Sequence, residues 1–345
     1  MLYVTTRNNR DAFTANRALL ENRGPDGGMY IPLRMPSFSA DEIHSLADKT
    51  FNQCVCDVLN LLFSTRLTSW DMDFTVGRRP VRLASISHRV TAAECWHNPE
   101  WEFERLVRDL TGLLQGNRDS ALPATDWVRI AVRIGVLFGI YGELIRFGMV
   151  TKGKKVDISL VSGDFSAPMA AWYARKWGLP IGRIICCCNE NNLPWELLHL
   201  GVMKTGAVAL QTGMPEADIA LPEDLERLIH ACGGPHEVMD FVDHCRVGKN
   251  YFPDEALLMQ MREGIHVSVV SSKRLDYTIP SVYHSHGYVL GQFSALAYSG
   301  LLDCRASTGE ITDAVILSDK GALCSSEMVS RAMGIPEEEL HRLLQ

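Results

Sequence analysis

The sequence predicts an α/β fold in which a parallel or mixed, twisted β-sheet is flanked by helices. The main observation is a strand, turn, helix and strand in succession. Residues 155–161 and 181–188 have the composition of buried strands, and a glycine turn and the helix 169–177 separate them. This order is typical of a right-handed parallel βαβ unit. The apolar run 127–147 is too long for a strand and is predicted to be a helix.

Apolar spacing and end signals predict the other elements in chain order. Helices are expected at 12–22, 51–63, 102–115 and 336–344, and a further helix begins after an N-cap at Ser39. A strand or hairpin is expected at 79–90, and a strand at 314–318. The turn at 24–32 contains Pro25 and two glycines, which supply turn geometry without chemistry.

Composition narrows the class of function. The 345 residues include 46% hydrophobic and 22% charged side chains, as in ordinary globular proteins, and are enough for two domains or one large unit. A net charge of -7 gives no reason to expect nucleic acid or an anionic membrane as partner. There is no membrane-spanning run, and the N-terminus lacks the apolar core of a signal peptide, so the expected location is cytoplasmic.

Ten cysteines raise the question of a metal or disulfide framework. Cys186, Cys187 and Cys188 continue a predicted strand, where neighbouring side chains point to opposite faces and do not converge on one metal. Free cysteine also packs as a small apolar residue, so buried thiols are predicted and no metal is expected. His284 and His286 share a face only if they lie on a strand, and no third ligand accompanies them.

Two segments carry a resemblance to a known family. The Thr-Thr-Arg start at 5–7 and the run Gly-Pro-Asp-Gly-Gly-Met-Tyr-Ile-Pro at 24–32 are similar to the opening of threonine synthases. Residues 94–105, Glu-Cys-Trp-His-Asn-Pro-Glu-Trp-Glu-Phe-Glu-Arg, resemble the signature Glu-Leu-Phe-His-Gly-Pro-Thr-x-Ala-Phe-Lys-Asp of these enzymes. The chain is identified as a truncated and degenerate member of this family. The resemblance implies the type II fold of pyridoxal phosphate (PLP) enzymes, which the tryptophan synthase β subunit shares.

The family makes threonine from O-phosphohomoserine, as a lyase, with PLP held on the signature lysine as a Schiff base. The matching position here is Glu104, and a carboxylate cannot form an imine with an aldehyde. No lysine occurs between Lys49 and Lys152, so no neighbour replaces it and no bound cofactor is expected. Glu104 is predicted to be a solvated helix carboxylate or a new acid or base. His97 and Asn98 remain from the signature as anion-binding, capping or core residues.

A second difference follows Gln115. Threonine synthases continue there into a Ser-Gly-Asp-Thr-Gly-Ser loop and a small domain that closes over the substrate. This chain passes through a short linker to 125–130, which resembles the segment Ser-Ile-Asn-Trp-Ala-Arg-Ile beyond that domain. The resemblance implies that roughly 100 residues, the size of one domain, are deleted. The expected parts are an N-terminal region (1–90), the degenerate lysine segment with its linker (91–120), and the rest of the large domain (121–345).

The turn after the predicted strand 155–161 matches the family's phosphate-binding Gly-Asn-Phe-Gly-Asn. Here it reads Gly163, Asp164, Phe165, Ser166 and alanine. Helix N-termini favour anions, but the Asp164 charge repels a phosphate and Ser166 restricts a backbone that the family keeps flexible with glycine. The alternative is that Asp164 or Ser166 caps its own helix.

Two C-terminal segments match the remaining parts of the family's site. Residues 287–295, including Ser294, resemble Gly-Tyr-x-x-Asp-Pro-His-Thr-Ala, with Gly291 and Phe293 in place of the polar Asp and His. Ser318 and Asp319 stand where the family has Leu-Ser-Thr-Ala-x-Pro, and a hydroxyl there is expected to face the pyridine nitrogen. Asp319 is predicted to form a surface ion pair with the adjacent lysine or to pair with a pyridinium.

These losses favour a catalytically inactive threonine synthase-like protein that acts by binding, regulation or assembly. Two alternatives stay open: a residual binder of an amino acid, phosphate ester or PLP, and an enzyme that uses Glu104, Asp164 or Asp319 without PLP. Surface left by the missing domain predicts a homo-oligomer or a protein partner. The altered pocket is expected to take at most a small anionic ligand.

Overall fold

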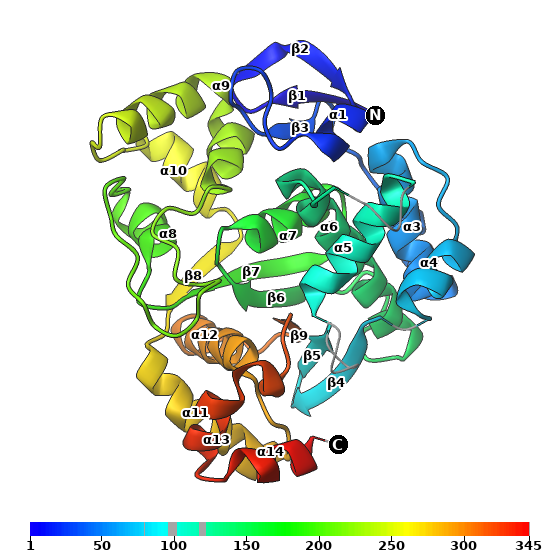
Figure 1. The fold of residues 1–345 in the computed structure, drawn as a ribbon, viewed down its shortest axis with the longest axis vertical. Coiled ribbons are helices and arrows are strands. Elements are labelled where there is room, and N and C mark those ends of the chain that lie inside the picture. Colours follow the sequence, from blue (N-terminus) through cyan, green and yellow to red (C-terminus); the bar gives the residue numbers. More distant parts are fainter. Residues whose placement is uncertain (79, 96–101, 117–121, 345) are drawn as a thin grey trace.

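A computed structural model describes residues 1–78, 80–95, 102–116 and 122–344. A six-stranded sheet occupies the centre of the molecule, with a three-stranded sheet at one end and the C-terminal helices at the other (Figure 1). The strand order of the central sheet is β4-β5-β9-β6-β7-β8. Its strands are β4 (Arg82–Ser87), β5 (Val90–Glu94), β9 (Ala314–Ser318), β6 (Val156–Val161), β7 (Ile181–Cys188) and β8 (Ile265–Val269). Only the β4–β5 hairpin pairs antiparallel, so the predicted mixed α/β sheet is confirmed.

The predicted βαβ unit is present. Helix α7 (Ser166–Lys176) joins β6 to β7, which pair in parallel with Ile158 opposite Ile184. Both strands are almost wholly buried, as expected when helices cover both faces of a parallel sheet. Cys186 and Cys188 pack in one hydrophobic core and Cys187 in the other, so these thiols alternate between the two faces as predicted.

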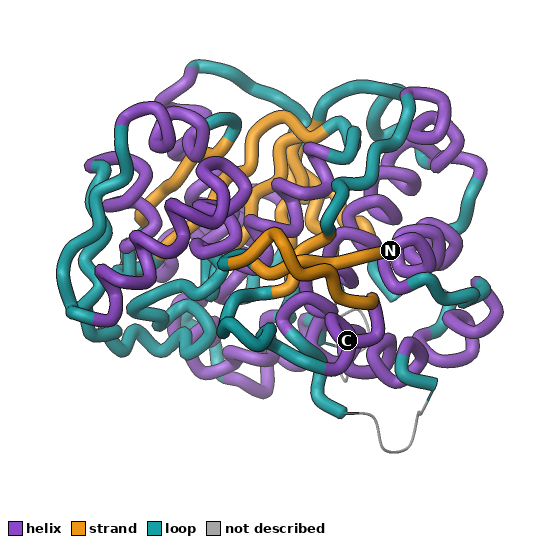
Figure 2. Tube along the Cα trace, turned by 90° about the horizontal axis from the view of Figure 1, so that it is seen from above, coloured by secondary structure: helices purple, strands orange, loops and turns teal. Residues whose placement is uncertain are grey.

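Helices lie on both sides of the central strands (Figure 2). One core includes α3 (Phe51–Phe63), α5 (Phe103–Leu114), α6 (Asp126–Arg146) and α7, and the other α11 (Ser272–His286), α12 (Gln292–Thr308), α13 (Ser326–Met333) and α14 (Glu337–Leu343). The remaining α-helices are α1 (Ala15–Leu20), α2 (Ala40–Ser45), α4 (Ser69–Val76), α8 (Leu193–Trp195), α9 (Leu225–Arg246) and α10 (Glu255–Arg262). The helices predicted at 51–63, 102–115, 127–147 and 336–344 match α3, α5, α6 and α14 to within a few residues. Ser39 caps α2 as predicted, in a capping box with Glu42.

Glycines let α6 pack closely against α3 and the residues before it. A Cβ atom on Gly139 would lie 2.6 Å from the Phe51 ring, and one on Gly142 would lie 2.9 Å from the carbonyl oxygen of Leu46. The close approach fixes the position of α6 against these segments.

The helix expected at 12–22 is partly wrong. Residues 12–14 belong to β2 (Asn8–Thr14), which pairs antiparallel with β1 (Leu2–Thr5), and β3 (Tyr30–Pro32) pairs with the other edge of β1. Only α1 of the expected helix forms. Pairing of Phe13 with Tyr3 across the strands overrides the local helical tendency of this segment.

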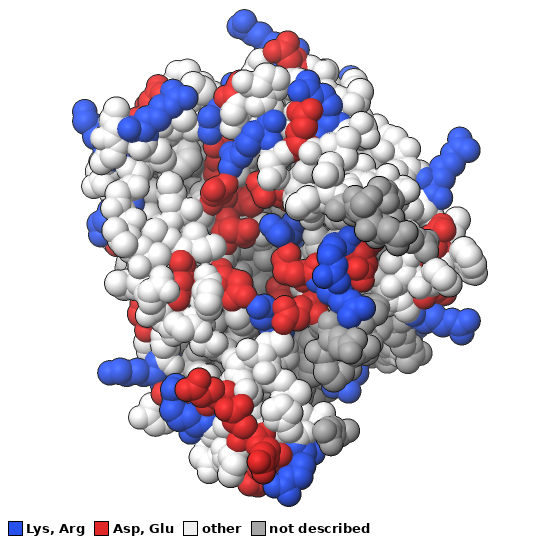
Figure 3. Space-filling model, in the orientation of Figure 1, with Lys and Arg blue, Asp and Glu red and all other residues white. Residues whose placement is uncertain are grey.

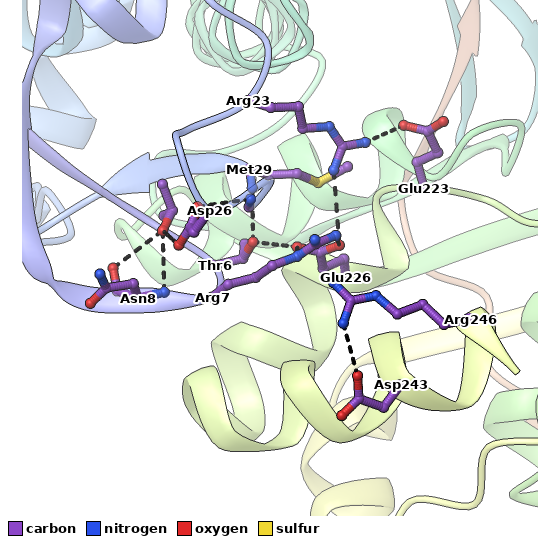
Figure 4. A network of polar contacts seen from close by, with 12 residues as sticks. Thr6, Arg7, Asn8, Arg23, Asp26, Met29, Glu223, Glu226, Asp243 and Arg246 are labelled. Atoms are coloured by element: carbon purple, nitrogen blue, oxygen red, sulfur yellow. Dashed lines mark hydrogen bonds and ion pairs between the residues drawn. The ribbon is translucent and has the colours of Figure 1, made fainter.

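A buried carboxylate fastens this N-terminal sheet to α9 (Figure 4). Glu226 accepts hydrogen bonds from the Thr6 hydroxyl and from the Arg7 guanidinium, whose Nη2 lies 2.9 Å from Glu226 Oε2. A second guanidinium, from Arg23, lies 3.9 Å away. The Thr-Thr-Arg start of the sequence therefore has a structural role.

None of the helices in the described residues is both long and apolar enough to cross a membrane. No three His, Cys, Asp or Glu side chains in these residues gather around a point that could hold a metal ion. His284 and His286 lie in the last turn of α11 and not on a strand, so they do not share a face.

Candidate functional site

A cavity of about 330 Å³ lies at the carboxyl ends of β6 and β9. Its walls come from the start of α5, one side of α6, the turn between β6 and α7, the start of α12, and the loops at 216–219 and 319–320. Acidic and basic side chains gather around a hollow in the middle of this face (Figure 3). Ligands of open α/β sheets bind outside the carboxyl ends of the strands, which makes this cavity the candidate site.

Five of the residues predicted for the site line this cavity: Glu104, Gly163, Asp164, Ser166 and Asp319. The structure therefore brings together side chains from α5, the β6–α7 turn and the end of β9, although they lie far apart in the sequence. His97 and Asn98 lie outside the described residues.

Three predicted residues lie behind the cavity wall. Phe165 is fully buried in the core and precedes α7 with a left-handed φ of 72°. The buried Ser294 hydroxyl donates to the Gly291 carbonyl at 3.1 Å, within its own helix end. The buried Ser318 hydroxyl donates to the Lys320 carbonyl at 3.4 Å. These side chains support the fold around the cavity and do not face it.

Arg133 forms the deepest charged contact of the site. Its guanidinium bonds both carboxylate oxygens of Asp319, with Nη2 2.7 Å from Oδ2, and lies 3.3 Å from the centre of the Phe103 ring. The Arg133 side chain is 7% exposed and Asp319 is 30% exposed. The predicted surface pair between Asp319 and the adjacent lysine is therefore wrong, because Asp319 is bound by an arginine from α6.

Arg129, one turn before Arg133 on α6, binds Glu104. Its Nη2 lies 3.0 Å from Glu104 Oε2, and its Nε is buried without a hydrogen-bond partner among the described residues. Glu104 is 54% exposed and also lines the cavity, so it is both a solvated helix carboxylate and part of the candidate site. Sequence reasoning missed both arginines, although two cations at i and i+4 on an otherwise apolar helix mark a polar site.

The turn before α7 is held by hydrogen bonds between its own residues. Asp164 accepts from the backbone N–H of Ser166 at 2.9 Å and from the Ser166 hydroxyl at 2.5 Å. The N-cap residue of α7 is Phe165, which makes no side-chain cap bond, so the predicted cap by Asp164 or Ser166 is replaced by a bond from the first helical amide to Asp164. Within the described residues Asp164 forms no ion pair, and its charge lies where a helix N-terminus would otherwise attract an anion.

Lys320 places an amine on the cavity wall, which the sequence argument did not foresee. Its ammonium binds Glu216, lies 3.7 Å from Glu102, and stands 5.9 Å from the centre of the Phe293 ring. Burial lowers the pKa of Lys320, but the hydrogen bond and charge of Glu216 outweigh burial and raise it above its ordinary value. The expectation of a site without an available lysine is therefore corrected: an amine is present, and it is held protonated.

Known proteins resemble the chain in sequence. A family model described as "Threonine synthase N terminus" matches residues 2–78. Threonine synthase-like 1 of Homo sapiens is 26% identical over 195 residues, which cover 55% of this chain and 26% of that protein. The threonine synthase of Pseudomonas aeruginosa is 24% identical over 201 residues, or 57% of this chain and 41% of that enzyme. The chain thus spans about a quarter of the length of the curated threonine synthase-like 1 proteins it matches.

Solved structures resemble the whole chain. PLP-bound threonine synthase from Brucella melitensis superposes with a TM-score of 0.84 at 18% identity, covering 100% of this chain and 94% of that one. Yeast threonine synthase superposes with a TM-score of 0.82 at 16% identity, covering 99% and 93%. At such identities the likeness shows the fold.

Proposed function

Because this chain belongs to the threonine synthase family, we propose that it is a threonine synthase-like protein without threonine synthase activity. It binds a small molecule in the cavity at the ends of β6 and β9, and acts through that ligand or through a partner protein. A fold is shared by proteins of many functions, so the proposal depends on the chemistry of the site.

The observation that carries this proposal is the ion pair of Glu104 with Arg129. The family's imine requires a lysine at position 104, and here the carboxylate is bound to a guanidinium 3.0 Å away. Lys320 is the one lysine of the described residues on the cavity wall, and it is held as an ammonium by two carboxylates. Only an unprotonated amine attacks an aldehyde, so Lys320 is a poor substitute.

The other contacts of PLP also do not fit this cavity. A phosphate at the start of α7 must displace the Asp164 carboxylate from the Ser166 amide and remain beside that charge. Asp319, which would pair with a pyridinium, is already bound in bidentate fashion by Arg133. We therefore expect no covalently held PLP.

The short connection between α5 and α6 supports the same proposal. Residues 115–125 separate the two helices, too few for the closing domain that the family resemblance implies at this point. Closure over a substrate excludes water and completes such sites, so an open cavity disfavours the family's reaction.

A homo-oligomer or a protein partner would cover the surface that this domain occupies in the family. Trp70 and Phe74, each 70% exposed on α4 beside α5, are the side chains we expect such a contact to bury.

A second candidate is an enzyme with PLP-independent acid–base chemistry. Glu104, Asp164 and Asp319 line one cavity, which favours it. Two of these carboxylates are bound by arginines, and the third accepts from the Ser166 amide, which disfavours it.

Titration of the purified chain with PLP tests the proposal. We expect no visible imine band that survives dialysis, and no borohydride-trapped adduct in the cavity by peptide mass mapping. O-phosphohomoserine should yield no threonine. An adduct on Lys320, or threonine formed by the pure protein, would refute the proposal; an adduct confined to surface lysines, unchanged in Lys320→Met, would support it.

Association is tested separately by sedimentation at micromolar concentration. We expect a dimer or larger species that dissociates in Trp70→Ser/Phe74→Ser. A wild-type monomer would remove the oligomer from the proposal and leave a different protein as partner.

A further inference from the structure

We propose that the cavity takes a small organic cation, a primary amine with an apolar body, in place of the anionic ligand that the family resemblance suggests. This inference rests on the proposed function, because it assigns a ligand class to the same cavity.

Formal charge on the cavity wall is negative. Among the described residues the lining includes five carboxylates and three cations, a balance of two negative charges. Two of these carboxylates are more accessible than the cations: Glu104 is 54% and Glu216 50% exposed, against 32% for Arg129 and 23% for Lys320. A ligand that enters from solvent therefore meets acidic groups first, and a phosphate ester is repelled.

The cations of the cavity are already paired with carboxylates. Arg133 is bound by both oxygens of Asp319, and Arg129 is bound by Glu104 through Nη2. The Nε of Arg129 is buried and has no hydrogen-bond partner among the described residues. The helix N-terminus at α7 is occupied by the Asp164 carboxylate.

An ammonium is already bound in the cavity, supplied by the chain itself. The Lys320 ammonium lies between Glu216 and Glu102 and 5.9 Å from the centre of the Phe293 ring. Carboxylates and an aromatic face are the groups by which proteins recognise ammonium ligands. This arrangement is independent of the charge count, and it shows that the site accommodates an alkylammonium group. Lys320 is then an internal competitor for any amine that enters.

The rest of the wall suits an apolar body of limited size. Val161, Ile219 and Phe293 contribute apolar surface, and the volume of about 330 Å³ is at the lower end for ligand pockets. A monoamine with a short alkyl or aryl chain places its ammonium at the carboxylates and its chain against these side chains. A phosphate or a dicarboxylate makes neither of these two contacts.

Calorimetric titration with n-hexylamine, hexanoate and inorganic phosphate tests the ligand class. The amine and the carboxylate have similar apolar bodies and opposite charge. We expect hexylamine to bind at least about tenfold more tightly than hexanoate, and phosphate not to bind measurably. Equal or tighter binding of hexanoate or phosphate would overturn the inference, and so would the absence of amine binding in both the wild type and the variant below.

The Lys320→Met variant tests whether the Lys320 ammonium competes with an added amine for the carboxylates of the cavity. Removing the ammonium while keeping an unbranched side chain one atom shorter should strengthen hexylamine binding about three- to fivefold, the strength of one partly exposed ion pair. Lys176→Met is the matched control. Lys176 also pairs with a carboxylate, Glu263 at 3.1 Å, and lies 5.3 Å from the Trp172 ring, but it is outside the cavity. Unchanged or weaker amine binding in Lys320→Met contradicts the inference.

A further substitution shows that the gain depends on the carboxylate. In the Lys320→Met background, Glu216→Gln should weaken hexylamine binding again, while Glu263→Gln should not. If Lys320→Met does not fold, as judged by circular dichroism, Lys320→Gln takes its place. A PLP imine or threonine formation would refute the proposed function without changing the affinities for hexylamine, hexanoate and phosphate. Failure of the proposed function and failure of the ligand class are therefore distinguishable.

Discussion

Arg133 is the single side chain on which the cavity depends most. It joins α6 to the end of β9 through Asp319 and to α5 through the ring of Phe103. An almost fully buried guanidinium is favourable only while its carboxylate partner and its stacking surface remain. Its neighbour Arg129 holds Glu104 in the same way but nearer to solvent.

Arg133→Met should lower the free energy of unfolding by about 2 kcal/mol, less than for a fully buried pair because Asp319 keeps contact with water. Urea unfolding of Arg133→Met, Asp319→Asn and the double variant measures the coupling of the two side chains. We expect the double variant to lose less than the two single losses together. Additive losses would show that the pair does not contribute as a unit.

Restoring the family's lysine tests how far the site has changed. Glu104→Lys should not restore threonine formation, because Asp164 still occupies the amide of Ser166 and Arg129 loses its partner. Threonine release from O-phosphohomoserine in the presence of PLP is the assay, with Glu104→Gln as the control. Activity in Glu104→Lys alone would mean that position 104 was the sole defect.

His230 on α9 gives a residue-scale pH dependence. Burial lowers its pKa to about 4, with Glu226 opposing the shift, and its ring lies 3.2 Å from Asn9 Oδ1. Between pH 6.5 and 4 the unfolded chain binds a proton at His230 that the folded chain does not. Stability should therefore fall as the pH drops through this window. His230→Gln should show a smaller loss in urea unfolding over that window, with His236→Gln as the exposed control; equal losses would contradict the assignment.

Among the elements, α6 connects the packing of the fold to the site. Its glycine side packs against α3 and the residues before it, and its arginines reach the cavity. Gly142 has no room for a methyl group, because the nearest atom is the Leu46 carbonyl oxygen of the backbone, which cannot rotate away as a side chain can.

Gly142→Ala should therefore destabilise the protein by about 1–3 kcal/mol, despite the better helix propensity of alanine. Gly206→Ala, where a methyl group meets no atom within 4 Å, is the control. Thermal unfolding should show a lower midpoint only for the first variant. A higher midpoint for Gly142→Ala would mean that the helices separate at little cost.

At the scale of the whole molecule, several contacts attach the N-terminal sheet to α9, and one of them is a buried carboxylate. Glu226 receives bonds from Thr6 and Arg7, whereas Glu223 nearby binds Arg23 at the surface. Removing a buried acceptor leaves its donors unsatisfied, which costs more than losing an exposed pair.

Glu226→Ala should make the N-terminal sheet several-fold more susceptible to limited proteolysis than Glu223→Ala. The central sheet should stay resistant in both variants, because its inner strands β5, β9, β6 and β7 are buried. Mass analysis of the first cleavage products locates the effect. Equal rates in the two variants would show that Glu226 does not hold the two parts together.

Local signals explain which parts of the fold were predictable. Helix α3 and strand β9 match their expected ranges because amphipathic spacing and flanking turns define them within a few residues. Residues 12–14 were assigned wrongly because their strand exists only by pairing with β1. Domain boundaries at 90 and 120, the cytoplasmic location, and His97 and Asn98 stay predictions.

The sequence by itself identified the family and predicted that Glu104 stands at the position of the Schiff-base lysine, because turn motifs and covalent chemistry depend on residue identity at one place in the chain. Only the tertiary structure decided which charges meet in the cavity. Arg133 and Asp319 are 186 positions apart, and Lys320 and Glu216 are 104 apart. Pairing of this kind depends on how helices pack across the sheet, since salt screens charges that lie far apart and no local pattern specifies the partner.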